Sequence, residues 1–232
     1  MSIRIIDHHV HIGEFYNLYF EPVSIAKELI SLGVKKWYVS SVTTCSSVFD
    51  FLKITKEIEA MVDYAPEQTM PVMWVTPEMI ENSRNLSLYN SFSYKMLKIH
   101  PYRFNYSEDQ ILNVFELAGN NNIPLLIHTG GRPEAEPLQF ERFIKDYSEV
   151  KTILAHGRPI KQACEIIKKY SNAYVDTAFM PIEDINFLIK TGLKNKIIFG
   201  SDYPIDCYFN PEKDRKEVYI NNLNQLKKLE II

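Results

Sequence analysis

The chain of 232 residues has few cysteines, no excess of basic residues and no long apolar run. Its three cysteines, Cys45, Cys164 and Cys207, are odd in number and far apart, which argues against a disulfide framework or a CxxC motif. Lysine and arginine total 26 against 29 aspartate and glutamate residues, and this net charge of -3 disfavours a dedicated nucleic-acid binder. No apolar run approaches the roughly 18 residues of a membrane span, and the first residues lack a signal-peptide pattern. We therefore expect a cytoplasmic protein with no nucleic-acid or membrane partner.

The composition is that of an ordinary packed protein. Hydrophobic residues make up 46% of the chain and charged residues 24%. No linker rich in proline, glycine or serine interrupts it, so we expect a single domain over residues 1–232. Assembly of that domain into a homodimer is compatible with the sequence.

Short β-rich segments alternate with longer amphipathic segments along the whole chain. We expect strands over residues 3–11, 37–42, 70–75, 96–100, 124–128, 152–156, 173–177 and 196–201. We expect helices over residues 21–32, 47–64, 107–120, 137–147, 159–170 and 181–190, and from 211 to the end. The first strand should break at Gly13, and residues 77–94 are the least regular part.

This alternation predicts an α/β fold with parallel strands, because parallel neighbours need a crossover connection. Eight such units predict a closed (β/α)8 TIM barrel. The alternative is an open, doubly wound sheet. Its nucleotide-binding version is disfavoured because no glycine-rich phosphate loop follows the first strand.

The six histidines are placed unevenly, since none lies in a predicted helix and five lie where predicted strands end. In a (β/α)8 barrel, catalytic groups project from this rim. His9 and His11 point to one face of their strand, and two convergent imidazoles suit a divalent metal. Asp7 has the same phase and could fix a histidine tautomer, whereas His8 points the other way. The alternative for this pair is two histidines satisfied within the fold.

Three further residues end predicted strands. His128 and His156 each follow an apolar strand and precede a turn, which favours a site over a core position once His9 and His11 are considered. Asp202 ends the last strand, which would lie beside the first strand in a closed barrel. Its carboxylate could ligate a metal or accept a proton from metal-bound water. Alternatively, Asp202 starts a turn ahead of Pro204.

Four polar residues near the same rim suggest substrate contacts. Lys98 and His100 end the fourth strand in one phase, and a buried Lys98 would need a partner or a modification. Arg132 and Arg158 follow the histidines of the fifth and sixth strands. Either arginine could bind a substrate carboxylate through two hydrogen bonds, and the alternative for each is a surface salt bridge.

The chain resembles the amidohydrolase superfamily, specifically the branch of TIM-barrel metal-dependent hydrolases called amidohydrolase 2. The segments that carry the resemblance, in the order of the family, are Ile6-Asp7-His8-His9-Val10-His11-Ile12-Gly13, Leu97-Lys98-Ile99-His100-Pro101, Leu126-Ile127-His128-Thr129-Gly130, Leu154-Ala155-His156-Gly157 and Phe199-Gly200-Ser201-Asp202-Tyr203-Pro204. Any one of these motifs is weak, but five in order are specific.

The resemblance implies a role for each matching residue. His9 and His11 match the ligands of the first strand, His128 the ligand of the fifth, and Asp202 the carboxylate of the eighth. His156 matches a histidine that polarises substrate in single-metal members and binds metal in two-metal members. Lys98 falls on the strand that carries a carboxylated, metal-bridging lysine in two-metal members. The Lys-x-His-Pro form found here is more similar to the single-metal branch.

These observations together predict a metal-dependent hydrolase that acts on an amide, lactone or ester bond of a small-molecule substrate. Zinc is the expected ion, with manganese and iron as alternatives. Asp202 and His156 would be the catalytic residues, and His9, His11, His128 and Asp202 the metal ligands. One alternative is a metal-dependent nonoxidative decarboxylase, which the resembled branch also contains. The other is a metal-binding barrel without catalytic activity.

Overall fold

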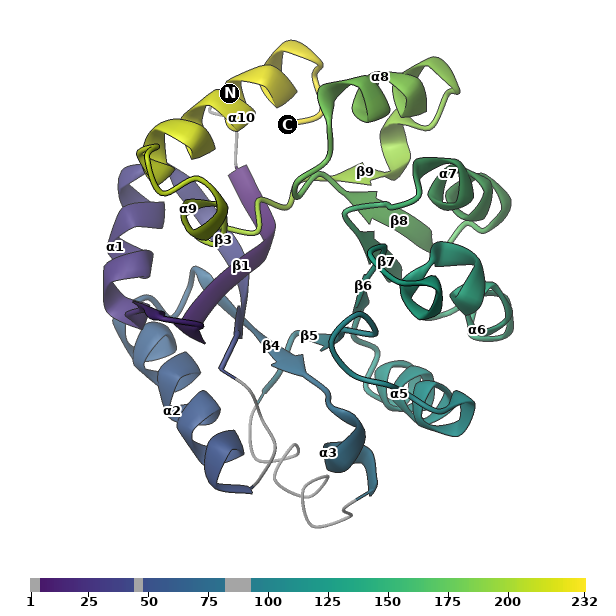
Figure 1. Ribbon diagram of the computed structural model, residues 1–232, viewed down its shortest axis with the longest axis horizontal. Coiled ribbons are helices and arrows are strands. Elements are labelled where there is room, and N and C mark those ends of the chain that lie inside the picture. Colours follow the sequence, from purple (N-terminus) through teal and green to yellow (C-terminus); the bar gives the residue numbers. More distant parts are fainter. Residues whose placement is uncertain (1–4, 44–47, 82–92) are drawn as a thin grey trace. The chain divides into compact units, whose positions relative to one another are not determined.

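The computed structural model describes residues 5–43, 48–81 and 93–232, with the backbone alone for residues 48–50 (Figure 1). Its contacts divide the chain into two compact units. The first unit consists of the described parts of Met1–Pro71 together with Phe199–Ile232, and the second of those of Val72–Ile198. The single domain expected from the sequence stays a prediction.

The fold is α/β, with a mostly parallel sheet. Hydrogen bonds order the described strands as β2-β1-β3-β4-β5-β6-β7-β8-β9, and only the pairing of β1 with β2 is antiparallel. The strands are β1 (Ile5–Phe15), β2 (Leu18–Phe20), β3 (Val34–Ser41), β4 (Thr69–Trp74), β5 (Met96–Ile99), β6 (Leu125–His128), β7 (Thr152–Ala155), β8 (Ala173–Asp176) and β9 (Ile197–Ile198). The predicted alternation of parallel strands and helices is confirmed.

Helices connect most neighbouring strands. The α-helices are α1 (Pro22–Ser31), α2 (Val48–Tyr64), α3 (Pro77–Glu81), α5 (Glu108–Asn120), α6 (Glu141–Asp146), α7 (Ile160–Lys169), α8 (Ile182–Lys190), α9 (Asp206–Phe209) and α10 (Arg215–Lys228). Short 3-10 turns cover Pro133–Ala135, Pro137–Phe140 and Lys194–Lys196. Among the described helices, none is both long and apolar enough to cross a membrane.

In the first unit, α1 and α2 pack on one side of β1 and β3 (Figure 1). The start of α1 follows from local chemistry, because the Glu21 carboxylate accepts hydrogen bonds from the backbone N–H groups of Val23 and Ser24. Pro22 occupies the first turn, where its missing N–H costs nothing. The helix thereby buries Ile25 and Leu29 against the sheet.

In the second unit, β5, β6, β7 and β8 are four-residue strands that are largely buried. Such short apolar runs are typical of parallel strands covered by helices. The helix α5 begins with a capping box, in which Ser107 and Gln110 each bond the other's backbone N–H. Because these strands are parallel, the residues at their carboxyl ends lie along one edge of the sheet.

The structure corrects the bounds of four predicted elements. The first strand continues through Gly13 to Phe15 and forms a hairpin with β2, which the sequence did not predict. The helix expected over residues 137–147 is a 3-10 turn followed by the short α6, and the last helix begins at Arg215, where Asp214 caps it. The eighth predicted strand shortens to Ile197–Ile198. Of the irregular stretch 77–94, residues 82–92 lie outside the described residues.

Candidate metal centre

Strand β1 supplies two buried histidines to the first unit. His9 and His11 are 1% and 2% exposed, and their ring centroids lie 5.0 Å apart with planes at 72°. Residues two apart on a strand project from the same face, so both rings point toward one location. His8 points away, as predicted, and its ring stacks on Tyr38 at 4.9 Å.

The backbone after β9 brings Asp202 to these histidines. Asp202 N–H donates to the carbonyl of His9 at 2.8 Å, and His11 N–H donates to the carbonyl of Tyr203 at 2.7 Å. A parallel bridge between Val10 and Tyr203 continues the same pairing. Asp202 adopts a left-handed φ of 61°, a conformation that aspartate tolerates better than most residues. The carboxylate is thus placed by main-chain pairing with the strand that carries the histidines.

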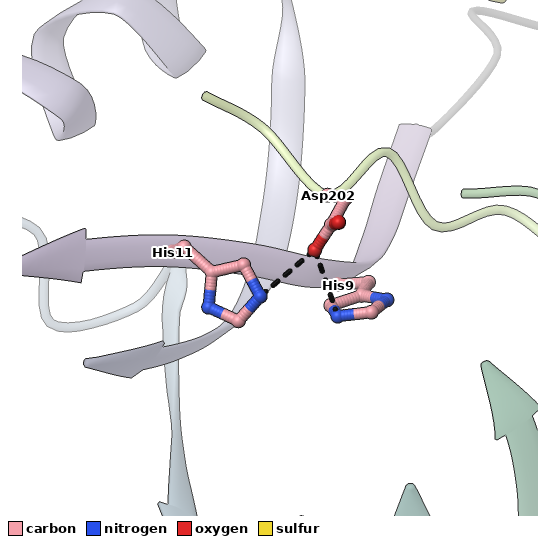
Figure 2. Close-up of side chains that lie close together, drawn as sticks. All are labelled: His9, His11 and Asp202. Atoms are coloured by element: carbon pink, nitrogen blue, oxygen red, sulfur yellow. Dashed lines mark ion pairs between the residues drawn. The ribbon is translucent and has the colours of Figure 1, made fainter. Parts of the chain in front are cut away.

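The three side chains converge on one carboxylate oxygen (Figure 2). Asp202 Oδ1 lies 3.0 Å from His9 Nε2 and 2.8 Å from His11 Nε2. One ligand atom from each residue lies within 4.8 Å of the others, and in residues 5–43, 48–81 and 93–232 no second group of three such side chains does so. Neutral imidazoles and a carboxylate are the ligand types that zinc and similar divalent ions prefer.

Ser40 holds the His11 ring in place from its other nitrogen. His11 Nδ1 lies 3.2 Å from the carbonyl oxygen of Ser40 and 3.0 Å from its hydroxyl. The carbonyl accepts from a protonated Nδ1, and the hydroxyl donates to an unprotonated one, so both tautomers have a partner. In the tautomer protonated on Nδ1, the lone pair of Nε2 faces Asp202 Oδ1 at 2.8 Å, which is the form of histidine that binds a metal. The residues present therefore fit a divalent metal.

Asp7 holds the two ligand-bearing segments together. Its carboxylate accepts hydrogen bonds from the N–H groups of His9 and Ser201 at 3.1 Å, from the Ser201 hydroxyl at 2.6 Å and from Tyr219 at 3.0 Å. Burial raises its pKa to about 7, although these hydrogen bonds lower it. The expectation that Asp7 fixes a histidine ring is wrong, because its hydrogen bonds go to backbone and hydroxyl groups instead.

The second unit contains a hydrogen-bonded pair formed by His128 and His156. His156 Nδ1 lies 3.0 Å from the carbonyl oxygen of Ala178, and His156 Nε2 lies 3.1 Å from His128 Nδ1. With both rings neutral, His156 donates to Ala178 and accepts from His128, so the lone pair of His128 lies on Nε2. Asp176 positions this pair by accepting the backbone N–H of His156 at 2.8 Å.

Aromatic stacking also orients His128. The His100 ring stacks on it with centroids 3.8 Å apart and planes at 15°, and Trp74 stacks on the other side of His100 at 5.2 Å. Lys98 is 2% exposed, and its Nζ lies 5.1 Å from the centre of the Trp74 ring. Trp74 was not among the residues predicted from the sequence. Its position at the end of β4 was the available signal, because the other site residues also end strands.

The two arginines lie near this pair, on exposed turns. The Arg132 guanidinium lies 5.0 Å from the centre of the Tyr102 ring, which itself lies 5.8 Å from the His128 ring. The backbone N–H of Arg158 donates to the Thr129 hydroxyl at 3.1 Å. Neither guanidinium pairs with a carboxylate in the described part of the chain, so both remain available for a ligand.

The predicted site residues therefore fall into two groups. His9, His11 and Asp202 come together in the first unit. The second unit contains the other six, which are Lys98, His100, His128, Arg132, His156 and Arg158.

A family model described as Amidohydrolase (Amidohydro_2) matches residues 97–222, more than half of the chain. The chain belongs to this amidohydrolase family. This match spans the His128–His156 pair and Asp202, and it confirms the resemblance noted from the sequence motifs. No curated protein matches the sequence.

Solved structures resemble this amidohydrolase in fold at low sequence identity. An amidohydrolase 2 from Bifidobacterium longum subsp. infantis has a TM-score of 0.61 and 14% identity, over 88% of this chain and 86% of that chain. The dihydroorotase of Campylobacter jejuni has a TM-score of 0.60 and 16% identity, over 87% and 70% of the two chains. The N-acetylneuraminate lyase of Proteus mirabilis has a TM-score of 0.58 and 16% identity, over 89% and 74%. Together, family and triad support an amidohydrolase-type function with a divalent metal.

Proposed function

We propose that this amidohydrolase is a metal-dependent hydrolase that cleaves an amide, lactone or ester bond. The observation that carries the proposal is the convergence of His9, His11 and Asp202 in a chain of this family. An enzyme needs such ligands near an open coordination position, and three protein ligands are typical of catalytic zinc sites.

The proposed architecture is a closed (β/α)8 TIM barrel. Two observations support it. The strands from β3 to β9 pair in parallel in the order of the chain. In addition, β9 pairs with β8, while the residues that directly follow β9 pair with β1. Both pairings are those expected where the last strand of a barrel meets the first.

In the proposed site, His9 Nε2, His11 Nε2 and Asp202 Oδ1 hold the ion. His128 is added through its match to the family's strand-five ligand, and the inferred lone pair on its Nε2 suits that role. Zinc is the proposed ion, with manganese or iron as alternatives. When bound, a divalent ion acts as a Lewis acid and lowers the pKa of a coordinated water to about 7.

The chain's own residues would supply the remaining chemistry. We assign Asp202 to orient the attacking water and to accept its proton. We assign His156 to polarise the scissile carbonyl in its protonated form, in which Nδ1 still donates to Ala178 and Nε2 donates to the substrate instead of accepting from His128. Arg132 and Arg158 are assigned to a substrate carboxylate. Lys98 and His100 would then support the site through Trp74 and His128.

A nonoxidative decarboxylase is the second candidate, and the available guanidinium of Arg132 favours it. Tyr102 holds that guanidinium beside His128, where a substrate carboxylate could be bound. A two-metal centre bridged by a carboxylated Lys98 is a variant of either proposal.

The test is turnover by the metal-loaded protein on a panel of amides, lactones, esters and aromatic carboxylates. We expect hydrolysis of one of the first three classes, and Asp202→Asn should reduce its rate by about 10²–10⁴-fold because it removes the proton acceptor. His11→Ala should abolish it. His8→Ala is the matched control, because His8 lies on the same strand but stacks on Tyr38.

Three results would decide against the proposal. Release of carbon dioxide without hydrolysis would favour the decarboxylase. Full turnover by Asp202→Asn on a substrate that His11→Ala cannot process would remove Asp202 from catalysis. Tight metal binding with no turnover of any class would favour the non-catalytic barrel.

A further inference from the structure

Four aromatic side chains form a continuous cluster in the first unit. Phe15 ends β1, Tyr16 lies in the turn to β2, and Tyr208 and Phe209 end α9. Phe15 contacts Tyr16 and Tyr208 edge-on, with centroids 4.8 and 5.1 Å apart. Tyr16 stacks on Tyr208 at 4.9 Å with 17° between the planes, and Phe209 contacts Tyr208 at 5.2 Å. Tyr16 is 79% exposed and Phe209 is 61% exposed, so much of this aromatic surface faces solvent.

The segments that carry this aromatic cluster also carry the metal triad. His9 and His11 share one face of β1, and the same strand continues through Gly13 to Phe15. Tyr208 and Phe209 belong to α9, which begins four residues after Asp202. A strand rise of about 3.3 Å per residue places Phe15 on the order of 13 Å along β1 from His11.

The exposed area of the cluster suits a small ligand. An aromatic side chain buries about 150–250 Å², so the exposed fractions of Tyr16 and Phe209 together offer on the order of 300 Å². A stable protein interface needs about 800 Å² from each partner. Apolar patches of about 300–600 Å² on monomeric proteins are often functional. A second copy of the chain is therefore a poorer fit than a ring-bearing ligand.

We infer that the aromatic cluster binds the apolar, ring-bearing end of an elongated substrate whose scissile bond reaches the metal triad. This inference rests on the proposed hydrolase function and adds a substrate class to it. The class is acyl compounds in which a spacer of roughly 10 Å separates the carbonyl from an aromatic ring. The exposed faces and edges of Tyr16 and Phe209 provide the offset and edge-on geometries that aromatic pairs prefer.

The test measures kcat/KM of the zinc-loaded protein on three esters that share one leaving group. Their acyl groups are acetyl, hexanoyl and 6-phenylhexanoyl. Wild type should prefer the phenylhexanoyl ester over the hexanoyl ester by about 3- to 10-fold in kcat/KM, the range of one aromatic contact. In Tyr16→Ala and in Phe209→Ala this ratio should fall toward one. Tyr19→Ala is the matched control. Tyr19 is 54% exposed on the same hairpin but pairs with Glu14, on the opposite face from Phe15, so its ratio should equal that of wild type.

Calorimetric binding of 6-phenylhexanoate provides a second readout that does not need turnover. We expect about 3- to 10-fold weaker binding in Tyr16→Ala than in wild type or Tyr19→Ala. If Tyr16→Ala binds 6-phenylhexanoate more weakly but the wild type turns over none of the esters, the hydrolase function is overturned. The inferred class of ligand is still supported in that case. Equal ester ratios and equal binding in wild type and Tyr16→Ala would overturn the inference. A dimer in sedimentation that Tyr16→Ala dissociates would also overturn it, in favour of self-association.

Discussion

At the scale of single residues, the candidate metal centre is positioned mainly by backbone. Asp202 reaches the histidines because its own N–H and the carbonyl of the next residue pair with β1. The carbonyl and the hydroxyl of Ser40 then hold the His11 ring at Nδ1. Such partners fix the orientation of ligand rings and raise their basicity. Side-chain freedom at the triad is consequently small before any ion binds.

Gly13 illustrates how closely the chain packs beyond the triad. Its φ is +89°, and an added Cβ would lie 2.5 Å from the Ser41 hydroxyl and 2.6 Å from both Glu57 and Thr43. These three side chains are hydrogen-bonded to one another, with Ser41 donating to Glu57 at 2.6 Å. The buried Glu57 thereby links α2 to the end of β3. A side chain at position 13 would disrupt this link.

We predict that Gly13→Ala destabilises the protein by about 2–4 kcal/mol, as the sum of left-handed strain and overpacking. Gly33→Ala is the control, because Gly33 has a similar φ of +80° and no atom within 4 Å of an added Cβ. Its cost should be the strain alone, about 1–2 kcal/mol. Urea unfolding of both variants measures the difference. If both variants lost the same unfolding free energy, the side chains around Gly13 would have to move aside for a methyl group without cost, which would contradict the prediction.

At the scale of elements, an ion pair joins the first helix of the first unit to its last. Arg215 begins α10 and donates to Glu28 of α1 from Nη2 at 2.6 Å and from Nε at 3.1 Å. Tyr203, next to Asp202, also donates to Glu28. Burial raises the pKa of Glu28, but the hydrogen bonds from Arg215 and Tyr203 outweigh burial and leave it below its usual value. The charged form of Glu28 is therefore favoured in the folded protein.

We predict that Arg215→Met lowers the free energy of unfolding by about 1–3 kcal/mol at pH 7. Because the pKa of Glu28 is depressed, its contribution is complete above the unfolded value near 4.5 and is lost as the pH falls through the folded value. The difference between wild type and Arg215→Met should therefore narrow below about pH 4.5. Urea unfolding at pH 7, 5 and 3 measures it.

Arg142→Met is the matched control for this prediction. Arg142 pairs with Glu108, but both side chains are about two-thirds exposed, at 66% and 64%. Exposed pairs contribute roughly 0–1 kcal/mol. The role assigned to the Glu28–Arg215 pair would be contradicted if Arg142→Met lost as much free energy of unfolding as Arg215→Met. A loss of unfolding free energy in Arg215→Met that does not change with pH would also contradict it.

The alternation of strands and helices was predictable because local signals agree with the fold. The capping box at Ser107 and the apolar runs of β5 to β8 identify their elements directly. The hairpin of β1 and β2 was missed because its turn contains Tyr16 at a φ of 53°, where such turns normally carry glycine or asparagine. A non-local contact overrides local preference at this turn, since Tyr16 stacks on Tyr208.

The site was predictable where a polar residue ends an apolar strand. His9, His11 and Asp202 share this feature, and the structure brings them together. Trp74 escaped notice because an aromatic residue at a strand end is equally typical of a core, and Tyr102 because it lies in the turn after β5. Their stacking on His100 and Arg132 depends on contacts between elements, which local sequence patterns do not encode.

At the scale of the whole molecule, the proposed ion links segments that are far apart in the chain. His9 and His11 lie on the first strand, whereas Asp202 lies thirty residues before the end. The core that surrounds them comes from the sheet and helices, and main-chain hydrogen bonds pair the segment of Asp202 with β1. Metal binding should therefore stabilise a protein that is already folded.

We predict that zinc at 100 times its dissociation constant stabilises the wild type by about 2.7 kcal/mol. For a chain of this size, that corresponds to a rise in Tm of roughly 5–11 °C. His11→Ala should be folded by circular dichroism and should show no such rise, whereas His8→Ala should show it in full. Unfolding of the metal-free wild type at room temperature would contradict a catalytic, non-structural role for the ion.

The most direct test of the metal centre is a crystal structure of the zinc-soaked protein with anomalous diffraction at the zinc edge. We predict one strong anomalous peak within about 2.0–2.2 Å of His9 Nε2, His11 Nε2 and an Asp202 oxygen. An anomalous map with no peak at these three atoms, or with zinc bound only elsewhere, would contradict it.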